Sequence, residues 1–291
     1  MPDNLQPPRN GGFALSGYRV LALEGRDAAA FMQAQSMNEV ATLPAGHWQW
    51  NGWLTPKGRV IALFALVKFS EELLWLLLPD ADPGELASQL QRFVFRSKVA
   101  FTARDELLPS GAFAVPGEAS GSVFAGDAVH GVELDLGAAG GARSLRIGAA
   151  ENDSLADADA TARWMAFDLE HGLPRLAQEQ AGQWTPQMLS LQRLHAFSVK
   201  KGCYPGQEIV ARTHFLGQSK RGLALLQGDE PVVPGSEVRD AERVLGRVVS
   251  VASSDGRHLA LVVLPLEREG SALQVDCRCV REIPLLDGLA R

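Results

Sequence analysis

The chain is poor in cysteine, with only Cys203, Cys277 and Cys279 among its 291 residues. An odd number of thiols cannot form a fully paired disulfide framework, and none of the three lies in a C-x-x-C pair. Iron–sulfur clusters are normally held by four thiolates, so the chain is poorly equipped to hold a cluster by itself. The six histidines show no metal-ligand spacing, and the sequence predicts no metal site.

Positive charge and long apolar runs are also scarce. Lys and Arg total 28 against 34 Asp and Glu, which gives a net charge of -6 and no global basic field for nucleic acid. Contact with nucleic acid would therefore have to be local, and a dedicated RNA-binding module would lack its basic face. The longest apolar runs, residues 60–69 and 73–79, are too short to span a bilayer, and residues 1–12 resemble neither a signal nor a transit peptide. These absences predict a cytoplasmic protein with no membrane contact.

The first part of the chain has a mixed helix and strand pattern. At 46% hydrophobic residues it can form real cores, and its length predicts two or three packed units. We expect strands at residues 18–23, 47–50, 60–69, 73–78 and 98–102, and helices at 27–40 and 83–95, with turns at Asn51–Gly52 and Pro56–Gly58. A weaker second cycle has strands at 112–115 and 144–147 and a helix at 157–171. A last helix from Thr185–Pro186 is expected to place Met188, Leu191 and His195 on one stripe.

After Arg221 the pattern changes to short alternating runs separated by Pro-Gly and Asp-Gly turns. About 70 residues of short strands suit a compact barrel or sandwich. The sequence therefore predicts an α+β fold with residues 1–222 as two lobes, approximately 1–108 and 109–222, and residues 223–291 as a small β-barrel. Cys277 and Cys279 are two apart on an expected strand, so we expect them to share a face with Val275 in the barrel core.

The segment Lys-Lys-Gly-Cys-Tyr-Pro-Gly-Gln-Glu, residues 200–208, is the most informative stretch. Gly202 and Pro205–Gly206 favour tight turns around Cys203, and the residues that follow suit the first turn of a helix. The neighbouring lysines and the positive end of that helix would favour the thiolate if solvent reaches it. The alternative is that Cys203 is a small buried residue in a tight turn.

This segment, together with Pro186-Gln187-Met188-Leu189-x-Leu191-Gln192, resembles the signature of the YgfZ family of folate-binding proteins. Supporting matches at residues 31–38, 56–59 and 96–99 extend the resemblance over most of residues 18–225. The family and the related glycine-cleavage T-proteins imply three domains around a central cavity that binds tetrahydrofolate or a one-carbon derivative. The implied role is assembly or repair of iron–sulfur proteins, including enzymes that modify tRNA, so the implied partners are those proteins or their assembly machinery. Because the net charge is -6, we expect tRNA contact to be indirect at most, and a tRNA-binding module lacks its basic face.

The resemblance also implies site residues. Leu169-Glu170-His171-Gly172-Leu173 resembles the T-protein pattern whose glutamate contacts the pterin, and two carboxylate oxygens can accept hydrogen bonds from adjacent N–H donors together. The alternative is a solvated glutamate at a helix end. Gln187 and Trp50 are the other expected folate contacts, although Trp50 could instead pack in the core beside Trp48. Cys203 is the expected reactive thiol, in a partner surface nearby made of Lys200, Lys201, Gly202, Tyr204, Gly206, Gln207, Glu208 and Arg212.

Two departures from the T-protein pattern bear on activity. T-proteins carry an acidic pair after a Gly-Gly-Val turn, whereas the matching stretch here places Ala62 and Leu63 where an acid is expected. Neither side chain can exchange a proton with the folate. In addition, the Lys-Gly-Asp-Phe pattern becomes Lys201-Gly202-Cys203-Tyr204. The sequence thus favours a folate-dependent accessory factor, and a folate-dependent one-carbon transferase is the alternative.

Overall fold

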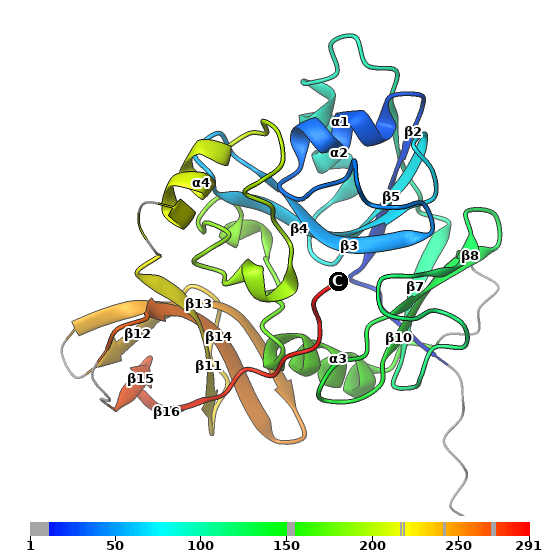
Figure 1. Ribbon diagram of the computed structural model, residues 1–291. Coiled ribbons are helices and arrows are strands. Elements are labelled where there is room, and N and C mark those ends of the chain that lie inside the picture. The colour runs from blue at the N-terminus through cyan, green and yellow to red at the C-terminus, as the bar shows by residue number, and fades with distance from the viewer. Residues whose placement is uncertain (1–11, 150–154, 216, 218, 241–242, 269–271) are drawn as a thin grey trace, which may run out of the picture.

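The computed structural model describes residues 12–149, 155–215, 217, 219–240, 243–268 and 272–291. Residues 1–11, most of the polar stretch that the sequence analysis singled out, lie outside this range. Within the described residues the chain forms two five-stranded sheets and a closed six-stranded barrel. Figure 1 shows these three units around a common centre, where the chain also ends.

The first sheet has the strand order β3-β4-β5-β2-β6, and its neighbouring strands are antiparallel. Helices α1 and α2 cover one face and form an apolar cluster with it, while the other face turns to the centre of the molecule. Asp82 caps α2 by accepting a hydrogen bond from the Glu85 amide at 2.8 Å, and Pro83 follows in the first turn, as the sequence predicted. The elements are β2 (Arg19–Glu24), α1 (Ala28–Gln35), β3 (His47–Leu54), β4 (Val60–Lys68), β5 (Leu73–Leu78), α2 (Pro83–Gln91) and β6 (Ala100–Ala103).

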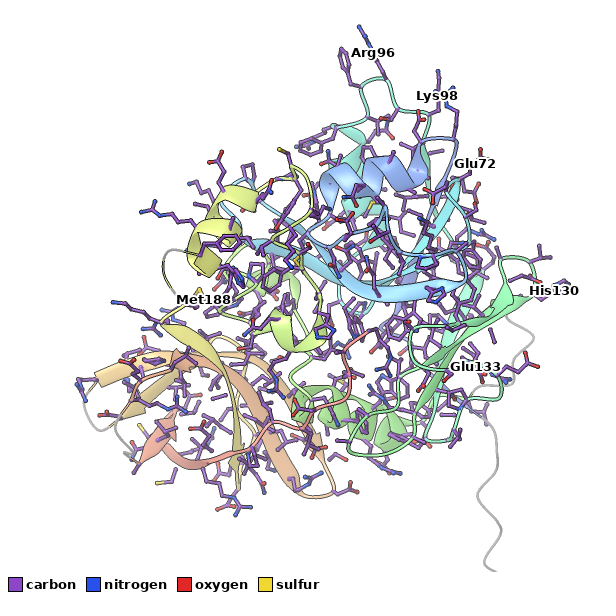
Figure 2. All side chains as sticks on the ribbon, in the orientation of Figure 1. Glu72, Arg96, Lys98, His130, Glu133 and Met188 are labelled. Atoms are coloured by element: carbon purple, nitrogen blue, oxygen red, sulfur yellow. The ribbon has the colours of Figure 1, made fainter. Side chains whose placement is uncertain are left out.

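Three local predictions in this unit were wrong. Helix α1 ends at Gln35 rather than near Val40. Asn51 and Gly52 do not form a turn but lie inside β3, where a Cβ on Gly52 would come within 2.7 Å of the Ala62 carbonyl oxygen. Glycine is therefore required there by close approach of the backbone. Helix α2 ends at Gln91 rather than near Phe95, and the following loop projects from the molecule with Arg96 and Lys98 on it (Figure 2).

The second sheet has the order β1-β7-β10-β9-β8, and helix α3 (Ala158–Glu170) lies against both this sheet and the C-terminal barrel. Asp157 caps α3 through the Ala160 amide at 2.9 Å. Trp164 of α3 lies edge-on to Phe13, which anchors the helix to the sheet. The strands are β1 (Phe13–Ala14), β7 (Leu107–Ala112), β8 (Ala125–Asp127), β9 (Gly131–Asp135) and β10 (Ser144–Ala149), so the strand expected at 112–115 lies earlier in the chain.

The barrel predicted at the C-terminal end is confirmed. Its strands follow the order β11-β14-β13-β12-β15-β16 and enclose an apolar cluster that includes Leu226, Val248 and Val262. They are β11 (Arg221–Gly228), β12 (Glu237–Asp240), β13 (Arg243–Ser254), β14 (Arg257–Pro265), β15 (Leu273–Val275) and β16 (Arg278–Ile283). The expectation that Cys277 and Cys279 fill the core was wrong, because a turn between β15 and β16 breaks the alternation and leaves both side chains exposed.

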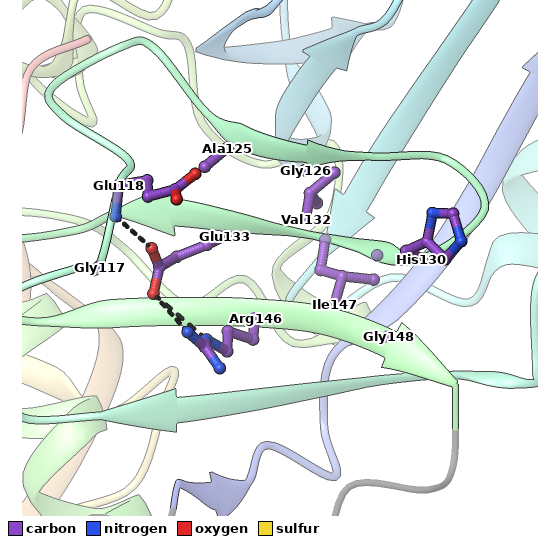
Figure 3. Close-up of a pocket in the computed structure, with 11 residues that line it drawn as sticks. Gly117, Glu118, Ala125, Gly126, His130, Val132, Glu133, Arg146, Ile147 and Gly148 are labelled. Atoms are coloured by element: carbon purple, nitrogen blue, oxygen red, sulfur yellow. Dashed lines mark hydrogen bonds and ion pairs between the residues drawn. The ribbon is translucent and has the colours of Figure 1, made fainter.

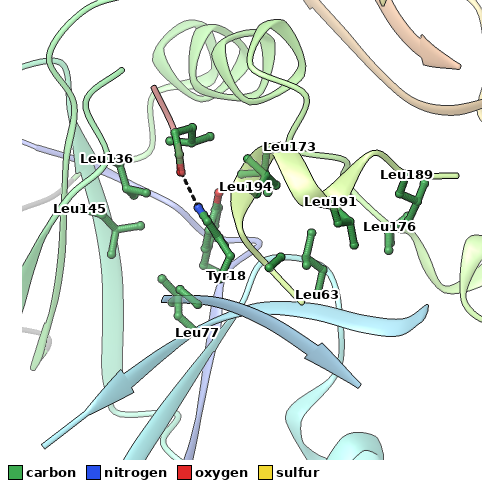
Figure 4. Close-up of a cluster of buried hydrophobic side chains, with 14 of the residues drawn as sticks. Tyr18, Leu63, Leu77, Leu136, Leu145, Leu173, Leu176, Leu189, Leu191 and Leu194 are labelled. Atoms are coloured by element: carbon green, nitrogen blue, oxygen red, sulfur yellow. Dashed lines mark hydrogen bonds between the residues drawn. The ribbon is translucent and has the colours of Figure 1, made fainter. Parts of the chain in front are cut away.

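The segment between α3 and the barrel contains two short 3-10 turns, η1 (Gln178–Gln180) and η2 (Leu191–Leu194), and helix α4 (Gln207–Phe215). The helix expected from Thr185 does not form. Ser190 and His195 have φ values of 47° and 54°, and these left-handed residues bound η2 on both sides. Leu189, Leu191 and Leu194 nevertheless pack in the centre (Figure 4), whereas His195 is exposed, so the expected stripe was wrong.

None of the helices in the described part of the chain is both long and apolar enough to cross a bilayer.

Candidate functional site

A cleft lies beside Glu170, between α3, the loop that joins β9 to β10, and the turn that joins β13 to β14. Its volume is about 360 Å³. Glu170 accepts a hydrogen bond from the Arg257 guanidinium at 2.8 Å, and its side chain keeps 20% of its surface exposed. The remaining lining includes Arg163 and the rings of Phe113 and Phe167. Asp255, in the turn between β13 and β14, adds a second carboxylate to the lining, so the cleft combines two carboxylates, two guanidinium groups and two aromatic rings.

Asp168 lies on the same helix but faces the interior. Its carboxylate is 2.7 Å from Arg143 and 3.7 Å from Arg175, and it accepts a hydrogen bond from the Tyr18 hydroxyl at 3.3 Å. The Arg143 guanidinium is sandwiched between Trp164 and Phe167, at 4.0 and 4.1 Å from the ring centroids. Burial beside Asp168 raises the pKa of the Tyr18 hydroxyl above its usual value. This buried network ties the residues just before β2 and β10 to α3, whereas Glu170 faces the cleft, where it pairs with Arg257.

Sequence reasoning missed this network. The available signal was Asp168 one helical turn after Trp164, on the stripe that α3 turns to the core. A carboxylate on the buried face of a helix needs a positively charged partner. The position of Asp168 therefore indicates that a cation lies nearby, but nothing in the local sequence identifies it as Arg143.

Trp50 and Gln187, the other expected folate contacts, do not line this cleft. Trp50 is buried, packs edge-on against Trp48 and donates from its indole N–H to the Leu289 carbonyl at 2.8 Å. The internal cavity that it lines measures about 10 Å³, which is roughly room for one water molecule. Gln187 is buried and donates to the Val210 carbonyl of α4 at 2.8 Å. The structure therefore places Trp50 in the core and Gln187 beneath α4.

Two buried side chains of the motif, those of Lys201 and Tyr204, anchor the loop that carries Cys203. The Lys201 ammonium is buried and donates to the carbonyls of Ser36 and Asn38 at 2.6 and 2.8 Å, and burial lowers its pKa to about 8. Tyr204 is also buried, donates to the Ser198 carbonyl at 3.1 Å, and has its pKa raised by burial to about 12. The expectation that Lys201 and Tyr204 belong to a surface was wrong, because both anchor the loop to residues beneath it.

Cys203 itself is exposed, which excludes the alternative of a buried packing residue. Helix α4 begins four positions later at Gln207, whose amide group donates to the Lys201 carbonyl at 3.2 Å. Gly206 allows this turn, since its φ is +82° and a Cβ there would come within 2.6 Å of the Thr55 carbonyl oxygen. The exposed members of the motif are Lys200, Gly202, Cys203, Glu208 and Arg212. The loop thus presents a solvent-accessible thiol on a fixed backbone.

The structure does not bring the thiol and the cleft together. None of the described residues that line the cleft belongs to the motif, and α4 lies apart from α3 in Figure 1. The reactive surface that we expected near the folate contacts is therefore a separate surface.

A second hollow, of about 490 Å³, lies on the second sheet (Figure 3). Its carboxylate, Glu133, accepts hydrogen bonds from the Glu118 amide at 3.1 Å and from the Arg146 guanidinium at 3.2 Å. None of the site residues expected from the sequence lines it. Among the described residues, no group of three or more His, Cys, Asp or Glu side chains is placed to hold a metal ion.

Comparison with known proteins gives consistent relatives, although no family model matches the chain. A Haemophilus influenzae protein, described as uncharacterized, is 30% identical over 251 residues, covering 84% of this chain and 85% of the relative. The tRNA-modifying protein YgfZ of Serratia proteamaculans is 29% identical over 256 residues (80% and 75% of the two chains), and that of Vibrio vulnificus strain YJ016 is 28% identical over 274 residues (88% and 84%).

Among solved structures, the glycine cleavage system aminomethyltransferase T from Bartonella henselae is similar, with a TM-score of 0.72 and 16% identity. The match covers 94% of this chain and 84% of that one, and it confirms the predicted T-protein-like fold. The fold, the Lys-Gly-Cys-Tyr-x-Gly-Gln-Glu motif and the relatives agree, and the chain belongs to the YgfZ family.

Proposed function

We propose that this chain is a cytoplasmic protein that binds tetrahydrofolate, or a one-carbon derivative of it, and supports the assembly or repair of iron–sulfur enzymes, including tRNA-modifying ones. The observation that carries the proposal is the cleft beside Glu170, because it presents the expected carboxylate in a space that can hold a ligand. Its volume falls within the range of roughly 300–1,000 Å³ that small-molecule sites occupy. The relatives named as tRNA-modifying proteins support the proposed cellular role.

The cleft suits the chemistry of a reduced folate. The pterin ring offers adjacent N–H donors, which the Glu170 carboxylate can accept, and a carbonyl acceptor, to which Arg257 can donate. Phe113 and Phe167 offer apolar surface to the ring system. Arg163 supplies a cation for the carboxylates at the far end of the ligand.

Cys203 is the proposed contact with iron–sulfur proteins or their assembly machinery. Its thiol is exposed, and Lys201, Tyr204 and Gly206 fix the loop that carries it. Thiolates are the usual protein ligands of iron–sulfur clusters, and a single exposed thiol suits a transient contact better than resident cluster binding. We therefore assign the partner surface to Cys203 with the exposed side chains of Lys200, Glu208 and Arg212.

The alternative function, one-carbon transfer of the T-protein kind, lacks an acid at the expected position. Ala62 and Leu63 are both buried on β4 and belong to apolar clusters on opposite faces of the first sheet. Neither can hold or move a proton, so we expect no aminomethyl transfer in a reconstituted glycine-cleavage assay.

The folate proposal is tested by calorimetric titration of tetrahydrofolate into the wild-type chain and Glu170→Ala. The substitution strands the donors of the ligand, so binding should weaken by about 1.5–3 kcal/mol. Glu133→Ala is the matched control, because Glu133 also pairs with an arginine in a hollow, and it should bind folate like the wild type. Equal affinity of Glu170→Ala and the wild type, with circular dichroism unchanged, would remove Glu170 from the site.

The proposed role of the thiol is tested in a deletion strain complemented with Cys203→Ser. The substitution is close to isosteric and lies at an exposed position, so folding and folate binding should be preserved while the activity of iron–sulfur enzymes falls. Cys277→Ser, which changes another exposed thiol, should complement fully. Full complementation by Cys203→Ser would show that the thiol is not required.

A further inference from the structure

The last eight residues of the chain leave the barrel and run to the centre of the molecule. Strand β16 ends at Ile283, and Figure 1 shows the following segment passing α3 before it ends between the three units. Leu289 is only 1% exposed there and belongs to the apolar cluster that both sheets share. Since the barrel is already closed by β16, this segment has a role outside the barrel.

Residues 286–291, which we call the C-terminal strap, form hydrogen bonds with the two walls of the Glu170 cleft. On the helical wall, the Leu286 amide donates to the carbonyl of Glu170 itself at 2.8 Å. On the loop wall, the Ala139 amide donates to the Asp287 carbonyl at 3.0 Å, and Arg291 donates to the Gly137 carbonyl at 2.8 Å. Arg291 also donates to the carbonyl of Asp135, at the end of β9.

The loop wall has little means of holding its own position. Residues 137–142 read Gly-Ala-Ala-Gly-Gly-Ala, and Gly140, Gly141 and Ala142 of this loop line the cleft. Glycine has no side chain to pack and the largest conformational freedom to lose, and alanine offers only a methyl group, which at Ala138 packs against the apolar core. The Gly137 amide also donates to the Asp135 carboxylate at 2.8 Å. Inside the loop, Ala138 and Gly141 exchange two backbone hydrogen bonds, and the Gly140 amide donates to His171 at 3.2 Å. The strap adds bonds at Gly137 and Ala139, on the part of the loop that leads from β9 into the cleft.

The strap is itself held by groups outside the cleft. The Trp50 indole donates to the Leu289 carbonyl, and the Arg291 guanidinium lies over Trp48, with 5.6 Å between its carbon and the ring centroid. Arg193 donates to the Leu286 carbonyl at 2.8 Å. The first sheet and the segment before α4 thereby hold the strap in place. The strap in turn holds the end of α3 and the loop between β9 and β10, which form the two walls of the cleft.

We propose that residues 286–291 are a positioning element of the folate site, which holds the loop wall and the end of α3 at the separation that the ligand requires. The proposal rests on folate binding in the Glu170 cleft. The strap residues touch the walls rather than the ligand, so their loss should act mainly by speeding ligand dissociation.

The test compares tetrahydrofolate affinity and dissociation rate in the full-length chain and its variants, at a temperature well below thermal unfolding. Arg291→Ala removes the bonds to Gly137 and Asp135, and Leu289→Ser weakens the buried anchor. Each should weaken binding at least tenfold, mostly through faster dissociation. Leu266→Ser changes a 58% exposed leucine beyond β14 and is the control that should bind like the wild type.

A chain ending at Leu285 provides a second measurement. It should bind tetrahydrofolate at least tenfold more weakly while its circular dichroism stays that of the wild type, and a synthetic peptide of residues 286–291 should restore part of the affinity. A purely structural role would instead change the circular dichroism together with the affinity. Unchanged affinity in Arg291→Ala and Leu289→Ser overturns the proposal, and so does tighter binding, which would mean that the strap obstructs the ligand. If the wild-type chain binds no tetrahydrofolate, the proposed function fails and this inference fails with it.

Discussion

Asp168 and Glu170 lie two residues apart on α3, and replacing each carboxylate by its amide should affect different properties of the protein. Asp168 is buried in an ion pair with Arg143, whereas Glu170 pairs with Arg257 in an open cleft. Changing each to its amide, Asp168→Asn and Glu170→Gln, removes one negative charge without changing the size of the side chain. The structure predicts that the first change destabilises the fold and that the second affects ligand binding.

The expected loss of stability depends on how exposed each carboxylate and its arginine partner are. Both Asp168 and Arg143 have side chains that are at most 1% exposed, so Asp168→Asn leaves a guanidinium buried with Arg175 as a second cation nearby. Removing one partner of a buried pair costs about 3–5 kcal/mol. The Glu170 and Arg257 side chains are 20% and 43% exposed, and exposed pairs contribute roughly 0.2–1 kcal/mol.

The assay is urea unfolding followed by circular dichroism at pH 7. Asp168→Asn should lower the free energy of unfolding by about 3–5 kcal/mol and Glu170→Gln by less than about 1 kcal/mol. The double variant Arg143→Met with Asp168→Asn removes the stranded cation and should recover part of the loss. If Asp168→Asn is no more destabilising than Glu170→Gln, the buried network does not hold α3 as described.

Three further predictions concern the motif and the barrel. Burial lowers the pKa of Lys201 from 10.5 to about 8, so the unfolded chain binds more protons than the folded chain between these two pH values. The free energy of unfolding of the wild type, relative to that of Lys201→Met, should therefore rise by up to about 1.4 kcal/mol per pH unit from pH 8 to 10.5. A difference that does not change with pH, measured by urea unfolding at a series of pH values, would contradict this. Gly206→Ala should destabilise the chain by at least about 1–2 kcal/mol in the same assay, while Gly202→Ala, whose Cβ would meet nothing within 4 Å, should be nearly neutral; equal effects would refute the turn geometry. Iodoacetamide should label Cys277 and Cys279 in the folded protein, and labelling only after denaturation, read by mass spectrometry, would refute the exposed hairpin.

Local rules predicted those parts of the fold that depend on neighbours in sequence. The helices expected from about residues 83 and 157 begin at Pro83 and Ala158, and the structure shows that Asp82 and Asp157 cap them through the amide three positions later. The β-barrel followed from short alternating runs with turn residues between them. Cys277 shows the limit of the same rule, because alternation predicts a shared face only where no turn intervenes.

The site depended more on residues far apart in the chain. The motif indicated a reactive thiol at Cys203 on the condition that solvent reaches it, and the structure shows that Cys203 is exposed. Lys201 beside it was expected at the surface, because nothing local identifies the carbonyls that bind it, which lie more than 160 residues earlier. Trp50 was expected to contact the folate, with core packing as the alternative. Nothing local shows that its indole N–H donates to the carbonyl of Leu289, near the other end of the chain. Glu170 was expected from the resemblance to the T-protein pattern, and nothing in that pattern indicates its partner Arg257, which lies 87 residues later at the start of β14.

A structure of the chain in complex with tetrahydrofolate would show whether reduced folate binds beside Glu170. The proposal predicts the pterin in the cleft, with its N–H donors at roughly 2.7–3.2 Å from the Glu170 carboxylate oxygens and Arg257 beside the ring. A ligand found instead in the hollow around Glu133, or at the internal cavity beside Trp50 with Glu170 still bonded only to Arg257, would contradict it.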